Sequence, residues 1–200
     1  MTRIALISGS LRRDSYNTRW LHQLAGGLDP SLEREVFDPQ ALRWPLFDQD
    51  SENDPQVWGQ VMQCHQRLCA CDGLIVTSPE YNGQMTPFLK NLVDWLSRVP
   101  YVDPLAANAF EARPVLLSSA STGWSGGALA LVQVRALFAY VGAHVLGPTI
   151  CLPYAGQAWT DFGYQLPPDT EVLASYALAQ FTPLVQQFSR TRSHGASVGH

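Results

Sequence analysis

The segment RIALIS, residues Arg3 to Ser8, opens the chain with a short apolar run that leads directly into Gly9-Ser10-Leu11-Arg12. A run of this length suits a buried strand of a parallel sheet, and the amphipathic stretch from Ser15 to Gly26 has the period of a helix. Glycine and serine between the two segments are typical of the loop that joins a strand to the next helix. The first 26 residues therefore predict a strand, a polar loop and a helix.

The same alternation recurs along the chain and favours a parallel sheet with helices on both faces. Strands are expected over Arg3 to Ser8, Glu33 to Asp38, Gly73 to Ser78, Pro114 to Ala120 and His144 to Ile150. Helices are expected over Ser15 to Gly26, Pro55 to Ala70, Pro87 to Ser97, Gly127 to Gly142 and about Asp169 to Arg190. We therefore predict an α/β fold with a doubly wound five-stranded parallel sheet, in one domain over residues 1–190, followed by a flexible tail over residues 191–200.

Composition restricts the class of protein. The chain has 200 residues, with 13 Lys and Arg against 17 Asp and Glu, a formal net charge of −4, 46% hydrophobic residues and 15% charged residues. This composition is that of a folded domain and not of a disordered chain. No apolar run approaches the roughly 20 residues that cross a bilayer, and no block of Lys and Arg offers a site for nucleic acid or an anionic membrane. We expect a soluble, cytoplasmic protein that binds neither nucleic acid nor membrane.

The cysteines show no Cys-x-x-Cys pair and no zinc-finger spacing. They are Cys64, Cys69, Cys71 and Cys151, and His65 stands beside the first of them. Three of the four lie on or beside a helical pattern, where small buried thiols are common. We expect reduced cysteines and no metal site.

The loop after the first strand has the composition of a phosphate site. Ligands of doubly wound sheets bind beyond the carboxyl ends of the strands, and the N-terminus of the next helix favours an anion. The candidate ligands in this loop are Ser10, Arg12, Ser15, Asn17 and Thr18. Neither a P-loop nor a Gly-x-Gly-x-x-Gly signature is present, so those nucleotide-binding classes are disfavoured. In the alternative interpretation, serine and aspartate only cap the helix.

Two further loops follow the third and fourth strands. In Pro79-Glu80-Tyr81-Asn82-Gly83, the proline fixes a turn and Asn82-Gly83 accepts positive φ, so backbone amides could face a flat ligand. The alternative is an ordinary turn, with Thr86 capping a helix whose apolar side chains fill the core. The segment Ser121 to Gly127 contains three glycines and allows a close approach to a planar ligand. A ligand with a phosphate at one end and an aromatic ring at the other would touch all three loops.

These motifs resemble the NADPH-dependent FMN reductase family, the flavodoxin-like group that includes chromate, quinone and azo-dye reductases. The likeness spans roughly Arg3 to Ile150. The resemblance implies a flavodoxin-like fold, FMN as the bound cofactor, and NADPH or NADH as the co-substrate. The resemblance implies that Ser10, Arg12, Ser15 and Asn17 hold the FMN phosphate and that the ring lies against Pro79 to Gly83, near Ser121. With Thr18 from the first loop, the expected cofactor-binding residues are Ser10, Arg12, Ser15, Asn17, Thr18, Pro79, Glu80, Tyr81, Asn82, Gly83 and Ser121.

The activity implied by this resemblance is a two-step hydride transfer. Hydride would pass from NAD(P)H through FMN to a small electron acceptor such as a quinone, a free flavin, an azo compound or a metal oxyanion, with no side chain required as a catalytic acid or base. One alternative is a flavodoxin-type carrier that passes electrons to a protein partner, but such carriers are strongly acidic, and a net charge of −4 disfavours this function. Another alternative is a regulatory protein in which FMN is structural.

The resemblance also implies a homodimer or homotetramer, with the helix from Lys90 to Arg98 near the subunit contact.

Two positions depart from the family pattern. Thr86-Pro87 stands where members often have Pro-Gly, and Leu129 stands where they often have arginine. An aromatic loop over residues 153–168 is expected to influence substrate choice. Surface aromatic side chains that serve the flavin site or a subunit interface are expected to include Trp95, Trp124, Tyr154 and Trp159.

Overall fold

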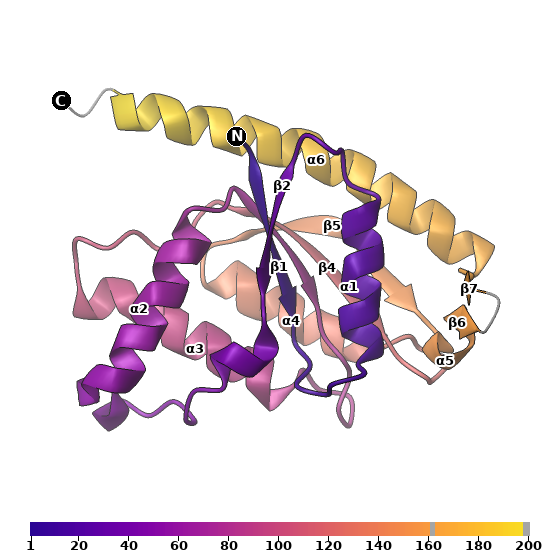
Figure 1. Cartoon of the computed structure of the whole chain (residues 1–200), viewed down its shortest axis with the longest axis horizontal. Coiled ribbons are helices and arrows are strands. Elements are labelled where there is room, and N and C mark those ends of the chain that lie inside the picture. The colour runs from indigo at the N-terminus through magenta and orange to yellow at the C-terminus, as the bar shows by residue number, and fades with distance from the viewer. Residues whose placement is uncertain (161–162, 198–200) are drawn as a thin grey trace.

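The computed structural model describes residues 1–160 and 163–197 and contains a five-stranded parallel sheet with the strand order β2-β1-β3-β4-β5. The strands are β1 (Arg3–Ser8), β2 (Glu33–Phe37), β3 (Gly73–Thr77), β4 (Pro114–Ala120) and β5 (His144–Leu152). After β2 the chain returns past β1 to form β3, so the strand order reverses between β1 and β3 (Figure 1). The predicted doubly wound sheet is confirmed, and in such sheets ligands bind beyond the carboxyl ends of the strands at this reversal.

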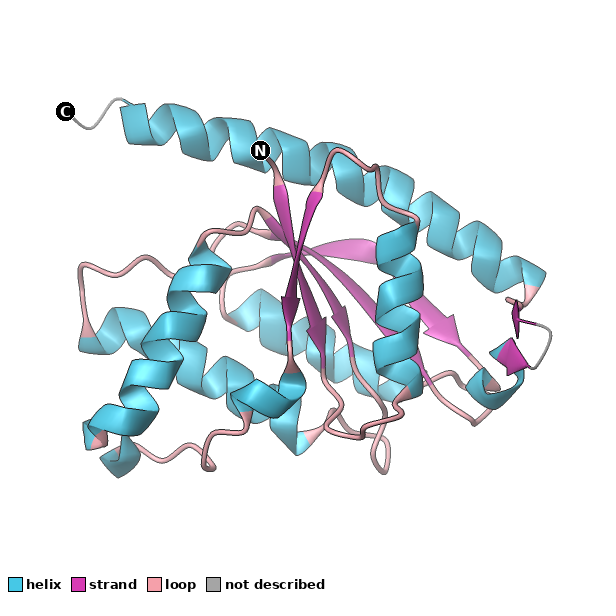
Figure 2. Ribbon diagram, in the orientation of Figure 1, coloured by secondary structure: helices cyan, strands magenta, loops and turns pink. Residues whose placement is uncertain are grey.

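Helices cover both faces of this sheet (Figure 2). The helical segments are α1 (Tyr16–Gly26), η1 (Pro39–Leu42), η2 (Asp50–Asn53), α2 (Pro55–Cys69), α3 (Pro87–Val102), α4 (Ala128–Tyr140), α5 (Ala155–Ala158) and α6 (Pro168–Ser197). Helices α1 and α6 pack on the face that carries Ile4 and Leu6, whereas α2, α3 and α4 pack on the face that carries Ala5 and Ile7. Successive side chains of β1 thus enter opposite cores, which explains its continuous apolar sequence.

The ends of several elements differ from the predictions, and helix α3 continues past the expected end at Ser97 to Val102. Strand β5 continues past Ile150 to Leu152, since its pairing with β4 continues as far as Ala120. Helix α6 continues past the expected end at Arg190 to Ser197 and runs across the amino ends of the strands (Figure 1). The Arg192 guanidinium lies 2.7 Å from the buried Asp72 carboxylate, which ties the last turns of α6 to the start of β3.

Residues 191–197 of the expected tail are helical, and the flexibility of this tail stays a prediction. Residues 198–200 lie outside the described residues.

Trp95 corrects one of the aromatic predictions. Its side chain is fully buried in the core, and its Nε1 donates a hydrogen bond of 2.9 Å to Pro45 O. It is not available to a flavin or to a second subunit.

The interpretation of α3 as a core-filling helix capped by Thr86 is confirmed. Thr86 Oγ1 accepts a hydrogen bond from Leu89 N. The buried side chains of the helix include Leu89, Leu92, Val93 and Leu96.

Two of the cysteines are buried as protonated thiols. Burial raises the pKa of Cys64 and of Cys71 to about 12. All four cysteines are free. The part of the chain that the structure describes brings no three His, Cys, Asp or Glu side chains together as metal ligands.

No described helix is both long enough and apolar enough to pass through a membrane.

Candidate functional site

Three loops meet at the carboxyl ends of β1, β3 and β4 and line a cleft of about 180 Å³. Its lining residues are Ser10, Arg12, Ser15, Tyr16, Asn17, Pro79, Glu80, Tyr81, Ala120, Ser121 and Thr122. The structure thus brings together the predicted cofactor-binding residues, with the exception of Thr18, Asn82 and Gly83. The sequence did not single out Tyr16, Ala120 and Thr122, although each stands beside a predicted residue.

The first loop passes closely between β3 and α3. The N–H of Gly9 donates a hydrogen bond of 2.6 Å to Thr77 O, and Thr86 Oγ1 donates one of 2.7 Å to Gly9 O. A Cβ on Gly9 would lie 3.1 Å from Thr77 O and 3.3 Å from Leu89 Cβ, closer than most real Cβ contacts. The absence of a side chain at Gly9 therefore sets the path of the loop toward α1.

Ser15 is the N-cap of α1. Its Oγ accepts hydrogen bonds from the N–H groups of Asn17 and Thr18, so the prediction of a helix cap is confirmed. The first turn of α1 contains no acidic side chain, and the cleft beside it is lined by the Ser10 hydroxyl and the Arg12 guanidinium. A helix N-terminus, a hydroxyl and an arginine form a donor set that fits a phosphate.

Asn17 and Thr18 use their side chains to hold the first loop in place. Asn17 Nδ2 donates a hydrogen bond of 2.7 Å to Ala120 O, and its Oδ1 accepts one of 3.0 Å from Ala120 N. Thr18 Oγ1 lies 2.8 Å from Ser8 Oγ and lines a neighbouring cavity instead of this cleft. Both residues position the loop, and a direct contact of either side chain with a ligand stays a prediction.

The second loop contains the predicted tight turn. Asn82 and Gly83 have φ values of 54° and 75°, and Tyr81 and Gln84 exchange two backbone hydrogen bonds around them. Tyr81 lines the cleft and is half exposed at its mouth, whereas Asn82 and Gly83 do not line it. The turn is confirmed, and a contact of its N–H groups with a ring stays a prediction.

Glu80 has a structural contact that the sequence did not reveal. Its Oε2 accepts a hydrogen bond of 3.1 Å from the N–H of Ala130 in the first turn of α4. A carboxylate is favoured at a helix N-terminus, so this bond anchors the second loop to α4. The two residues are 50 positions apart, and no local pattern in the sequence could have indicated their contact.

The third loop turns sharply at Gly126 and Gly127, whose φ values are 61° and 91°. A Cβ on Gly126 would lie 2.9 Å from Cys151 Cβ, and a Cβ on Gly127 would overlap Ser119 Oγ. Among the described residues, the buried Ser119 Oγ has no hydrogen-bond partner. The glycines allow α4 to begin directly against the end of β4.

An aromatic cluster closes the side of the cleft next to α1. The Tyr16 ring stacks on Trp159 with centroids 5.7 Å apart, Trp159 packs against Tyr164, and the Arg12 guanidinium lies 5.5 Å from the Tyr16 ring centre. Burial raises the pKa of the Tyr164 hydroxyl. The aromatic loop thus contacts the first turn of α1 through Trp159 and Tyr16, and its influence on substrate choice stays a prediction. Trp124, by contrast, is 81% exposed.

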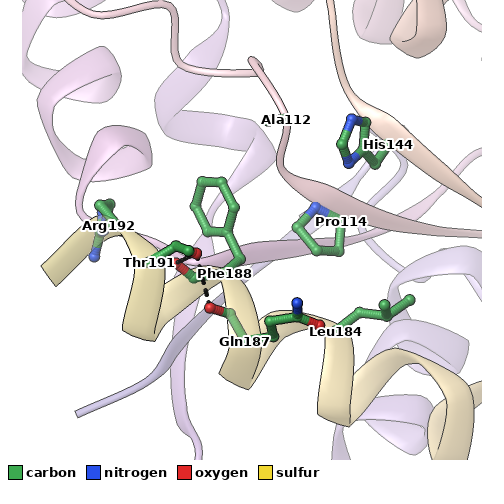
Figure 3. A pocket seen from close by; sticks show the side chains of 8 residues that line it. All are labelled: Ala112, Pro114, His144, Leu184, Gln187, Phe188, Thr191 and Arg192. Atoms are coloured by element: carbon green, nitrogen blue, oxygen red, sulfur yellow. Dashed lines mark hydrogen bonds between the residues drawn. The ribbon is translucent and has the colours of Figure 1, made fainter. Parts of the chain in front are cut away.

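A larger hollow of about 640 Å³ lies at the opposite edge of the sheet (Figure 3). Pro114 and His144, which begin β4 and β5, line it together with Leu184 and Phe188 of α6. Its walls are mainly apolar, and the Arg192 guanidinium at its end is already paired with Asp72. This hollow lacks the converging loops of a doubly wound binding site, so the cleft is the better candidate.

Comparison with known proteins shows a matching family and similar enzymes. Residues 2–157 match the family described as NADPH-dependent FMN reductase. A 2-hydroxy-1,4-benzoquinone reductase of a Burkholderia species is 34% identical over 140 residues, which cover 70% of this chain and 71% of the relative. An NAD(P)H-dependent FMN reductase of Pseudomonas aeruginosa is 31% identical over 156 residues, which cover 76% of this chain and 78% of the relative.

A solved structure shares the fold. FerB, a flavoenzyme NAD(P)H:(acceptor) oxidoreductase from Paracoccus denitrificans, matches with a TM-score of 0.78 and 22% sequence identity, and the match covers 94% of this chain and 99% of that chain.

Proposed function

The chain belongs to the NADPH-dependent FMN reductase family, and on that premise we propose that its cleft binds FMN and that the enzyme reduces a small acceptor of the quinone type. It is an FMN-dependent NAD(P)H oxidoreductase. The observation that carries the proposal for the site is the convergence of three loops on one cleft, with phosphate donors at one end and Pro79, Tyr81 and Ser121 also in its lining.

The phosphate end of the cleft fits FMN by its chemistry. Arg12 supplies a cation, Ser10 supplies a hydroxyl, and the N-terminus of α1 supplies a favourable dipole. The Ser15 cap and the two hydrogen bonds of Asn17 to Ala120 fix these donors before a ligand arrives. Such preorganisation lowers the entropy lost on binding.

The other end of the cleft orients a flat ring. FMN, when bound, accepts hydride from NAD(P)H and passes it to the acceptor. Pro79 and Tyr81 border the space for the ring, and the bond from Ala130 N to Glu80 holds their loop against α4. The N–H groups of Asn82 and Gly83 are candidate donors to the ring edge. No side chain is assigned as a catalytic acid or base, because the chain's part is binding and orientation.

A visible absorption spectrum tests this function. We expect the purified protein, incubated with FMN and desalted, to keep the two visible flavin bands. Anaerobic NADPH or NADH should bleach them, and benzoquinone should restore them without a protein partner. A colourless protein would contradict FMN binding. Bands that dithionite bleaches but neither nucleotide does would identify an electron carrier instead.

We also propose that a second copy of the chain covers the outer face of α4. Leu129, Val132 and Tyr140 lie along this face at helical spacing and are 62%, 67% and 90% exposed. Apolar side chains in such a row favour a protein interface. Leu129 stands where the family often has arginine, so an apolar contact would replace a charged one at this position.

Sedimentation of the purified enzyme tests this assembly. We expect a dimer or tetramer for the wild type and a smaller species for Val132→Glu, because a buried unpaired carboxylate opposes association. Val172→Glu is the matched control, since Val172 is equally exposed but lies on α6. A wild-type monomer at micromolar concentration would contradict the proposal.

We propose a cytoplasmic location, which the free cysteines support. Disulfides are rare in that compartment, and the buried thiols of Cys64 and Cys71 pack as small apolar groups.

A further inference from the structure

A second polar cavity, of about 400 Å³, adjoins the cleft on the other side of the first loop. It is lined by Ser10, Leu11, Arg12, Arg13, Thr18, Asp38, Pro39, Gln40 and Arg43. Ser10 and Arg12 line both spaces, so the cavity and the cleft are neighbours across these two side chains. A ligand in the cavity would therefore lie beside the phosphate end of the cleft.

Three arginines of this cavity lack an acceptor. In the described ranges 1–160 and 163–197, the cationic side chains without an ion pair or side-chain hydrogen bond are Arg12, Arg13, Arg19 and Arg43. All of these except Arg19 line the cavity. In a chain with a net charge of −4, such a cluster is a local positive field that attracts an anion.

A hydrogen bond between two loops brings the arginines together. Gln40 Nε2 donates a hydrogen bond of 2.8 Å to Leu11 O, which holds η1 against the first loop. Arg43, the residue after η1, thereby lines the same space as Arg13. The carboxylate in the lining is Asp38, whose Oδ1 accepts a hydrogen bond of 2.9 Å from Gln40 N as the cap of η1. The three arginines of the lining therefore leave it with a net positive charge.

We propose that this cavity binds the 2′-phosphate of NADPH and makes the enzyme prefer NADPH to NADH. The proposal rests on the proposed function, because it places the co-substrate of that reaction. NADPH differs from NADH only in this phosphate, and arginine binds a phosphate through paired, charge-assisted hydrogen bonds.

Steady-state kinetics of the FMN-loaded enzyme test the assignment. Arg13→Gln and Arg43→Gln should each raise KM for NADPH about fivefold, and the double variant about twentyfold, because charge-assisted hydrogen bonds to the phosphate are lost. The KM for NADH and both kcat values should change less than about twofold. Arg19→Gln is the matched control, since Arg19 is an exposed, unpaired arginine on α1 that lines neither space. It should leave both KM values unchanged.

Calorimetry provides a readout that does not depend on turnover. Adenosine 2′,5′-bisphosphate should bind the wild-type holoenzyme more tightly than adenosine 5′-monophosphate, and the double variant should lose that difference. Equal affinity for inorganic phosphate and the bisphosphate would overturn the proposal in favour of a simple anion site. FMN affinity weakened by Arg13→Gln or Arg43→Gln would overturn it too, because the arginines would then belong to the FMN site.

The remaining outcomes separate this inference from the proposed function. An enzyme whose FMN is bleached equally well by NADH and NADPH keeps the proposed function and overturns the inference. An Asp38→Asn variant that loses affinity for NADH would also overturn it, because Asp38 would then bind the ribose 2′-hydroxyl. If neither nucleotide bleaches bound FMN, the proposed function itself fails.

Discussion

Arg12→Ala is expected to raise the dissociation constant of FMN about fiftyfold, which corresponds to about 2.3 kcal/mol of binding free energy. Arg12 supplies the cationic side chain of the cleft lining, and it has no carboxylate partner among the described residues. A bound phosphate would therefore lose its charge-assisted hydrogen bonds, and the described lining of the cleft contains no second cationic side chain to replace them. The Tyr16 ring, 5.5 Å from the guanidinium, holds the arginine beside the cleft in the wild type.

Quenching of FMN fluorescence on titration with apoprotein measures this effect. The affinity of the wild type should fall as NaCl is added, and the affinity of Arg12→Ala should fall less, because screening acts on the removed charge. Arg19→Ala is the control, because it removes an equally unpaired arginine of α1 that does not line the cleft. Equal FMN affinities of Arg12→Ala and the wild type would contradict the assignment of the phosphate end.

Gly127→Ala is expected to lower the free energy of unfolding by about 4 kcal/mol, the combined cost of a left-handed residue with a side chain and of overpacking. Gly127 has φ 91° at the N-cap of α4. The added methyl group would overlap Ser119 Oγ and lie 2.8 Å from Ser119 Cβ, in a fully buried part of β4. Either α4 or the end of β4 must shift, and both border the proposed FMN site.

Urea unfolding followed by circular dichroism measures this change as a shift in midpoint. Gly59→Ala is a matched control within α2, where an added Cβ has no atom within 4 Å. It should raise stability by about 0.5–1 kcal/mol, since alanine is the better helix former. Ser119→Gly in the Gly127→Ala background should recover part of the loss, because it removes the overlapping side chain. An unchanged midpoint for Gly127→Ala would contradict this account.

Local chemistry explains which features the sequence could predict. Strand β1 and the turn at Asn82 and Gly83 depend on neighbouring residues, through an apolar run and through tolerance of positive φ. The grouping of the three loops follows from strand direction, because parallel strands end at the same edge of the sheet. These features therefore appear in the structure where the sequence placed them.

The features that the sequence did not predict depend on distant partners. The bond between Glu80 and Ala130 joins residues 50 positions apart, and the ion pair of Arg192 with Asp72 extends α6 beyond its expected end. Trp95 fits a core as well as a surface, and its buried Nε1 donates to Pro45 O, 50 positions earlier in the chain. A tryptophan alone gives no indication of which environment it will occupy.

The double hydrogen bond between Asn17 and Ala120 has a consequence for the order of assembly during synthesis. The amide of Asn17 meets both backbone polar groups of a residue 103 positions later, so the loop after β1 reaches its final shape only when β4 has joined the sheet. A nascent chain that ends before Ala120 contains most of the proposed phosphate donors but not the support that fixes them. We therefore expect the proposed FMN site to form late, after β4 has left the ribosome.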